Sequence, residues 1–214
     1  MPRWVRFAIN GAIELNFKLR RAVKNWVLMN PREDDETAFS ERGRPCLIRV
    51  IDAISDLVSN DLSRRNCAAL TLGRVTALSD ECGLYVYKNH GLSFLLDALD
   101  SSNRGVHESV VARHLLFCLH NILKIKAVQH SIREDEEQIT DLVKSCFHYF
   151  FAYYKVHDAV YNSARCLIII ADISPVAKKF AGASYYISEA LRKFSGVKEL
   201  CDVLAIMQNV YLSK

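Results

Sequence analysis

The sequence predicts an all-α protein in which helical hairpins stack on one another as a solenoid. The 214 residues include only four prolines and eight glycines, which are few for the many turns of an all-β chain. Apolar residues recur at intervals of three and four, which is the period of a helix and not of a strand. One such series is Val111, Leu115, Cys118, Leu119 and Ile122. The same order of helix, polar joint and helix then returns along the chain.

Two segments precede the repeats. Residues 1–30 are predicted to form an amphipathic helical segment that caps the first repeat, although this segment could also fold back on a surface or meet a partner. No secretory signal is expected, because charged residues interrupt its apolar positions. Residues 31–45, PREDDETAFSERGRP, are polar and acidic, which predicts a flexible linker.

The main body, 46–214, repeats a unit of an apolar helix, a short polar joint and a second apolar helix. The copies are residues 46–75, 92–123, 139–173 and 185–212. Each hairpin exposes apolar faces that it cannot bury alone, so neighbouring units are expected to share one continuous core.

Residues 66–123 follow a recognisable order of motifs. An Ala-Ala-x-x-Leu helix is followed by a polar turn (SDE), a short helix ending at a glycine, a Leu-Leu-x-x-Leu helix, a polar joint (DSSN) and a helix ending in LHNIL. The positions concerned are Ala68, Ala69, Leu72, Gly91, Leu95, Leu96, Leu99 and Asn121. In this order the segment resembles the armadillo-repeat family over about one and a half repeats. The later units match more loosely, with the bulky FHYFFAYYKVHD in place of a compact joint, so a HEAT-like or irregular solenoid is the alternative.

The resemblance implies a right-handed α-solenoid for 46–214 and a non-enzymatic role as a scaffold or adaptor. In such repeats the asparagine of the inner helix faces the concave surface and can bond an extended peptide. The partner is therefore expected to be another protein, bound through an extended or helical segment. The candidate partner-binding residues are Arg65, Asn66, Arg74, Arg113, Asn121, Lys124, Asn162 and Arg165.

Cys118, His120 and Asn121 are the side-chain types of a cysteine nucleophile site, and Cys and His also bind zinc. Residues two apart on a helix point about 200° apart, so Cys118 and His120 cannot share one site. Phosphate-binding glycine loops are absent from the sequence. We therefore expect no catalytic residue, no cofactor or small-molecule substrate and no metal.

One further pair resembles a known motif. Trp26 and Asn30 lie four residues apart, as do the Trp and Asn that nuclear-import adaptors of the armadillo class repeat along successive inner helices. Only one such pair is present, so Trp26 is expected to anchor the cap helix.

The net charge and the cysteines limit the alternative partners and the cellular compartment. A net charge of +4 is only mildly basic, so nucleic acid is the rival partner and not the favoured one. Self-assembly through residues 1–30 is a second rival. Seven cysteines without a CxxC motif favour a reducing compartment, the cytoplasm or the nucleus. No apolar run reaches the roughly 18–20 residues of a membrane span, so membrane insertion is not expected.

Overall fold

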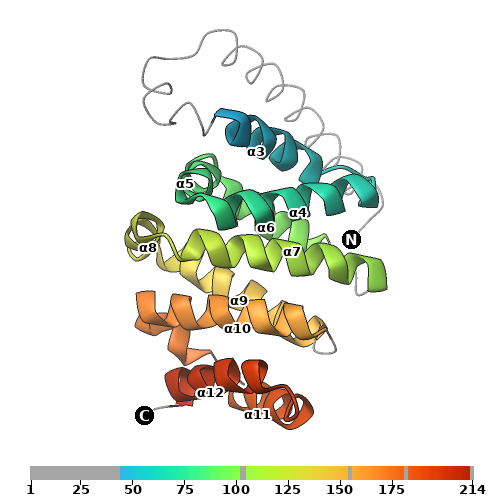
Figure 1. Cartoon of the computed structure of the whole chain (residues 1–214). Helices are drawn as coiled ribbons and strands as arrows, with labels where there is room; N and C mark the ends of the chain where they lie inside the picture. Colours follow the sequence, from blue (N-terminus) through green and yellow to red (C-terminus); the bar gives the residue numbers. More distant parts are fainter. Residues whose placement is uncertain (1–43, 102–104, 154–155, 181–182, 213–214) are drawn as a thin grey trace, which may run out of the picture. The chain divides into compact units, whose positions relative to one another are not determined.

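The computed structural model describes residues 44–101, 105–153, 156–180 and 183–212 (Figure 1). The chain divides into two compact units, 1–45 and 46–214. The cap predicted for 1–30, the Trp26–Asn30 pair and residues 31–43 of the predicted linker lie outside the described residues. The second unit is all-helical throughout its described part, which confirms the all-α prediction.

Ten α-helices and one 3-10 helix are described. They are α3 (Arg44–Leu57), α4 (Leu62–Leu78), α5 (Asp80–Lys88), α6 (Gly91–Asp100), α7 (Val106–Leu123), α8 (Lys126–Ile132), α9 (Glu136–Ala152), α10 (His157–Ile173), η1 (Pro175–Lys179), α11 (Ala183–Lys193) and α12 (Lys198–Leu212).

From α5 onward these elements form units of three: a short helix, a second helix and a third helix. The units are α5–α6–α7, α8–α9–α10 and η1–α11–α12, and the pair α3–α4 precedes them. The last helix of the pair, α4, and the last helices of the three units, α7, α10 and α12, pack successively against one another, and we call them the long-helix row (Figure 1). Helices α6 and α9 pack against each other in a second row. The sequence analysis foresaw the hairpins but not the short elements α8 and η1.

Hydrogen bonds between units join residues about one repeat apart. Tyr87 donates to the hydroxyl of Ser131, 44 residues further on, and Tyr211 donates to the carbonyl of Leu167, 44 residues back. Arg65 and Glu108 are 43 residues apart. A fold in which each unit contacts its sequence neighbour has the one-dimensional organisation of repeat proteins.

Several helices begin at side chains that satisfy their first free amides. The carboxylate of Asp61 accepts from the amide of Ser63 at the start of α4. The hydroxyl of Ser79 accepts from the amide of Cys82 in α5, and the carboxylate of Asp135 accepts from the amide of Gln138 in α9. These caps fix where the polar joints end and therefore where each unit starts.

The turn between α5 and α6 depends on Gly91. His90 has a positive φ of 59°, and the chain then passes so close to Val86 that a Cβ at position 91 would collide with the Val86 side chain and carbonyl. The sequence analysis took Gly91 as the end of the short helix. The structure corrects this: α5 ends at Lys88, and Gly91 is the first residue of α6.

The core runs through the stack along the apolar series of the sequence. All five residues of the series Val111–Ile122 are at most 1% exposed. In α4 the small residues Ala68 and Ala69 are buried, and Gly73 lies against the ring of Phe117 in α7. Small side chains at this contact allow the backbones of α4 and α7 to approach closely, which sets the spacing of the long-helix row.

Candidate functional site

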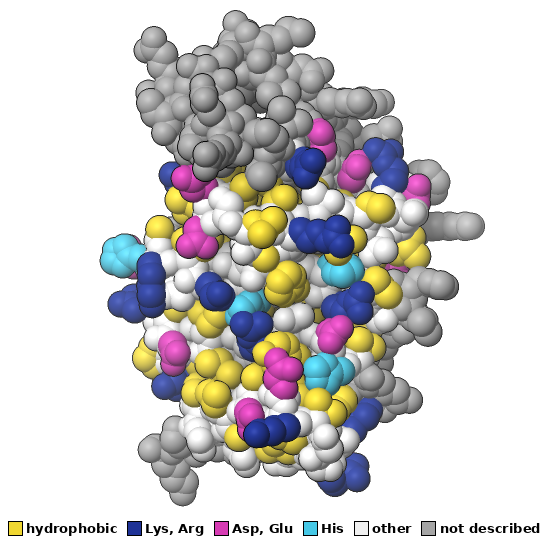
Figure 2. Space-filling model, in the orientation of Figure 1, with side chains coloured by type: hydrophobic (Ala, Val, Ile, Leu, Met, Phe, Trp, Pro, Cys, Tyr) yellow, Lys and Arg dark blue, Asp and Glu magenta, His cyan; other side chains and the backbone are white. Residues whose placement is uncertain are grey.

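The long-helix row presents one continuous surface, which we call the long-helix face. It is the face turned to the viewer in Figures 1 and 2, where Lys, Arg and His side chains, together with several Asp and Glu side chains, lie among hydrophobic ones. Five of the eight predicted partner-binding residues lie in α4 and α7, one directly follows α7, and two lie in α10. By element, they are Arg65, Asn66 and Arg74 in α4, Arg113 and Asn121 in α7, Lys124 just after α7, and Asn162 and Arg165 in α10.

Two of these residues hold the row together. Arg65 donates to the carboxylate of Glu108 across 2.8 Å, and the two side chains are only 13% and 9% exposed. Asn121 is 8% exposed, and its Nδ2 donates to the carbonyl of Gly73 at 3.2 Å and to Thr76 Oγ1 at 3.4 Å. The sequence analysis expected Asn121 to be open to a peptide. The structure corrects this, because its amide protons are used to join α7 to α4.

The other two asparagines are also not open. Asn162 is 6% exposed in α10. Asn66 is half-buried in α4, and its Oδ1 is buried without a hydrogen-bond partner among the described residues. Asn121 and Asn162 therefore lie within the stack, and Asn66 lies at its margin.

Four predicted cations do reach the long-helix face. Arg74 and Lys124 are exposed, and neither has an ion-pair partner within the described part of the chain. Arg113 pairs at 3.3 Å with Asp158 of α10. Arg165 lies over the ring of Tyr161, 5.2 Å from its centroid. Three successive long helices thus place positive charge on one surface.

Burial and the nearby cations lower the pKa values of two histidines of α7. Burial lowers the pKa of His114, and the nearby Arg113 and Arg74 lower it further, although Asp158 opposes them. Burial together with Arg165 and Lys124 lowers the pKa of His120 to about 4, against the opposing effect of Asn121. Both imidazoles are therefore neutral at pH 7, and each lies beside two cations.

Apolar side chains separate the cations, and the sequence analysis did not assign them to the site. Phe117 in α7 is half-buried, as are Tyr161, Ile168 and Ile169 in α10. Tyr161 and Ile168 lie four residues before and three residues after Arg165, so helical spacing places them beside it. The helical spacing of Tyr161 and Ile168 from Arg165 is the feature of the sequence from which they could have been assigned to the site. The Tyr161 hydroxyl also donates to Glu199 of α12 at 3.0 Å.

Toward α12, the last helix of the row, acidic side chains become exposed. Asp172 at the end of α10 is exposed, and so are Glu199 and Asp202 in α12. The positive part of the long-helix face is consequently the part made by α4, α7 and the first two-thirds of α10.

Cys118 of α7 is a core residue. Cys118 is fully buried, and burial raises the pKa of its thiol to about 12, against a lowering effect of the hydrogen bond from Thr76. A thiol held in this way is not a nucleophile at neutral pH. No group of His, Cys, Asp and Glu within the described residues could hold a metal ion.

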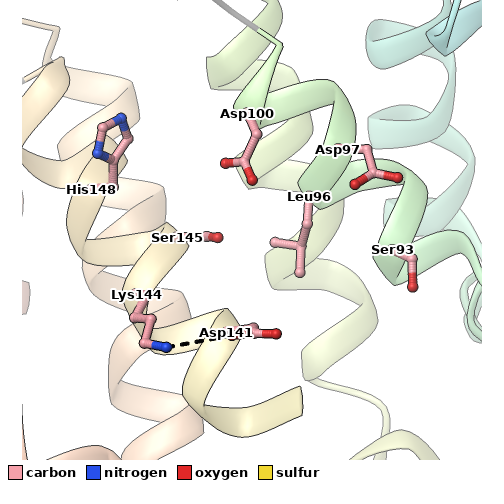
Figure 3. A pocket seen from close by; sticks show the side chains of 8 residues that line it. All are labelled: Ser93, Leu96, Asp97, Asp100, Asp141, Lys144, Ser145 and His148. Atoms are coloured by element: carbon pink, nitrogen blue, oxygen red, sulfur yellow. Dashed lines mark ion pairs between the residues drawn. The ribbon is translucent and has the colours of Figure 1, made fainter. Parts of the chain in front are cut away.

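A separate shallow groove of about 480 Å³ lies between α6 and α9 (Figure 3). Its acidic side chains are Asp97 and Asp100 from α6 and Asp141 from α9, and Lys144 pairs with Asp141 at 3.7 Å. Burial and the adjacent Asp100 raise the pKa of Asp97. This groove was not predicted from the sequence, because Asp97 and Asp141 are 44 residues apart along the chain and meet only when α6 packs on α9.

Comparison of the chain with protein-family models, with curated proteins and with solved structures finds no match. Among the described helices, none combines the length and the apolar character needed to cross a membrane.

Proposed function

We propose that this chain is a non-enzymatic protein-interaction module, an armadillo-like right-handed solenoid that holds a segment of a partner protein on the long-helix face. One observation carries the proposal. Four cations from three successive long helices share a surface with half-buried aromatic and aliphatic side chains. Arginine and aromatic residues are the types enriched where proteins bind one another.

The arrangement suits an elongated partner. The long helices pack successively, and neighbouring packed helices are typically about 8–10 Å apart. A segment that crosses from α4 to α10 therefore spans on the order of 20 Å, which about six extended residues cover. Such a segment can contact each helix in turn without a deep pocket.

The resemblance to armadillo repeats also supports a partner-binding face, but the residues that make the contacts differ from the asparagines expected from the sequence. Asn121 and Asn162 lie inside the stack and Asn66 is half-buried, so the partner contacts pass to the cations and to the apolar side chains beside them. We therefore assign the partner-binding role to Arg74, Arg113, Lys124 and Arg165 with Phe117 and Tyr161.

Affinity purification with the full chain as bait tests the proposal. Wild-type protein is compared with Arg74→Ala/Arg165→Ala and with the control Lys88→Ala/Arg133→Ala, whose exposed cations lie on α5 and just after α8. Partners that mass spectrometry finds with wild type and control, but that the face variant loses by severalfold, support the proposal. Equal recovery of every partner by all three proteins contradicts it.

A further inference from the structure

The long-helix face carries two separate points of positive charge. The first lies around His114, where Arg74 of α4 and Arg113 of α7 both act on the imidazole. The second lies around His120, where Lys124 and Arg165 both act on the imidazole. Of these four cations only Arg113 has a described carboxylate partner, Asp158.

The second point also contains an unsatisfied polar group. His120 is 3% exposed, and its Nδ1 is buried without a hydrogen-bond partner among the described residues. Buried nitrogens of this kind are normally paired, and the two cations beside this imidazole disfavour its protonation. Lys124 and Arg165 themselves have no carboxylate partner within the described part of the chain, so an anion over them would pair two charges that are otherwise unpaired.

We propose that the long-helix face binds an extended peptide segment with acidic side chains, one over Arg74 and Arg113 and one over Lys124 and Arg165. This inference rests on the proposed function and names the chemistry of its partner. Charge complementarity selects the occupant: the cations of α4, α7 and α10 outnumber the free carboxylates there, and Asp158 is already paired.

The order of the two points fits an extended chain that crosses the helices. The first point joins α4 to α7 and the second joins the end of α7 to α10, so a segment that crosses from α4 to α10 meets them one after the other. Alternate residues of an extended chain lie about 7 Å apart on the same side. Two acidic side chains on the protein-facing side of such a segment can therefore reach one point each, with the half-buried Phe117 and Tyr161 on the same face.

Selection from a random library of twelve-residue peptides displayed on phage tests this proposal with the full chain as target. Enriched peptides are resynthesised and their affinities are measured for wild type, for Lys124→Glu/Arg165→Glu and for the control Lys88→Glu/Arg133→Glu, which has the same change in net charge. Circular dichroism melting shows that each variant is folded. We expect peptides rich in Asp and Glu, a loss of at least about tenfold with the face variant, and no more than about twofold with the control.

The other outcomes separate this inference from the proposed function. Enriched peptides without acidic residues that still lose affinity with the face variant overturn the acidic partner but keep the face as a binding surface. Peptides that bind all three proteins equally overturn both. Salt-dependent binding of single-stranded RNA that the face variant abolishes, with no acidic peptide enriched, overturns the peptide and assigns the cations to phosphates instead.

Discussion

Nδ2 of Asn121 in α7 lies 3.2 Å from the carbonyl oxygen of Gly73 in α4. This hydrogen bond crosses between two units and reaches a backbone carbonyl in the middle of a helix, at the point where the lack of a side chain at Gly73 lets Phe117 approach. The asparagine that resembles a peptide-binding residue thus holds neighbouring repeats together. The consequence is that the two long helices share a fixed register, which places Arg74 beside His114.

Replacing Asn121 with alanine should lower the free energy of unfolding by about 1–2 kcal/mol, because the substitution removes hydrogen bonds to Gly73 and Thr76 within a buried contact. Urea unfolding followed by circular dichroism measures the change. Asn209→Ala is the matched control, since Asn209 is exposed on α12. Equal stability of the Asn121 and Asn209 variants would show that the inter-repeat bond is dispensable.

Gly91→Ala should destabilise the protein by about 2–3 kcal/mol, because the added Cβ would collide with the side chain and the carbonyl of Val86. At Gly196, between α11 and α12, nothing lies within 4 Å of an added Cβ. Gly196→Ala should therefore leave the midpoint of thermal unfolding unchanged within about one degree or raise it slightly. If the two variants melt alike, the close turn between α5 and α6 is not as described.

Protonation of His120 on unfolding should make the stability of the protein depend on pH. Its pKa is about 4 in the folded protein, below the ordinary value of 6.5, so the unfolded chain binds the extra proton. Stability is therefore complete above pH 6.5 and falls as the pH drops from 6.5 toward 4. Between pH 7.5 and pH 5 this term amounts to about 2 kcal/mol.

Urea unfolding of wild type and His120→Gln at pH 7.5 and pH 5 isolates that term, because the other titrating groups are common to both proteins. Wild type should lose about 2 kcal/mol more than the variant on acidification. Identical losses would mean that His120 titrates in the folded protein as it does in water.

Exposed cysteines should react with an alkylating reagent, and buried cysteines should not. Cys67 is exposed on α4, whereas Cys118, Cys146 and Cys166 are fully buried, and burial raises the pKa of Cys118 to about 12. Brief treatment of the native protein with iodoacetamide, read by peptide mass spectrometry, should label Cys67 and leave the three buried thiols unmodified until urea unfolds the chain. Early labelling of Cys118 would contradict its place in the core.

Helical periodicity was enough to predict the class of fold and the core. The series Val111–Ile122 is buried as predicted, because an apolar stripe at helical spacing has to face another helix. The joints after α3 and α6 were also predictable from their polar residues. The short element η1 was not, because five residues carry too little periodicity to be recognised.

The site was predictable only in part. The resemblance to armadillo repeats named Arg74, Lys124 and Arg165 among the candidates, but the sequence could not tell which polar residues would be consumed by contacts between units. Arg65 and Glu108 pair across 43 residues, and Asn121 reaches Gly73 across 48. Such pairings depend on the register between stacked helices, which a single sequence does not specify.

The most direct test of the central claim is to locate the bound partner on the surface. The photoreactive residue p-benzoylphenylalanine is placed at Phe117, on the long-helix face, or at Phe94, which is half-buried on α6 outside the long-helix row. With a selected peptide bound, illumination should crosslink the peptide to the protein carrying the label at position 117 and not to the one labelled at 94. Crosslinking from position 94 without crosslinking from 117 would contradict the account.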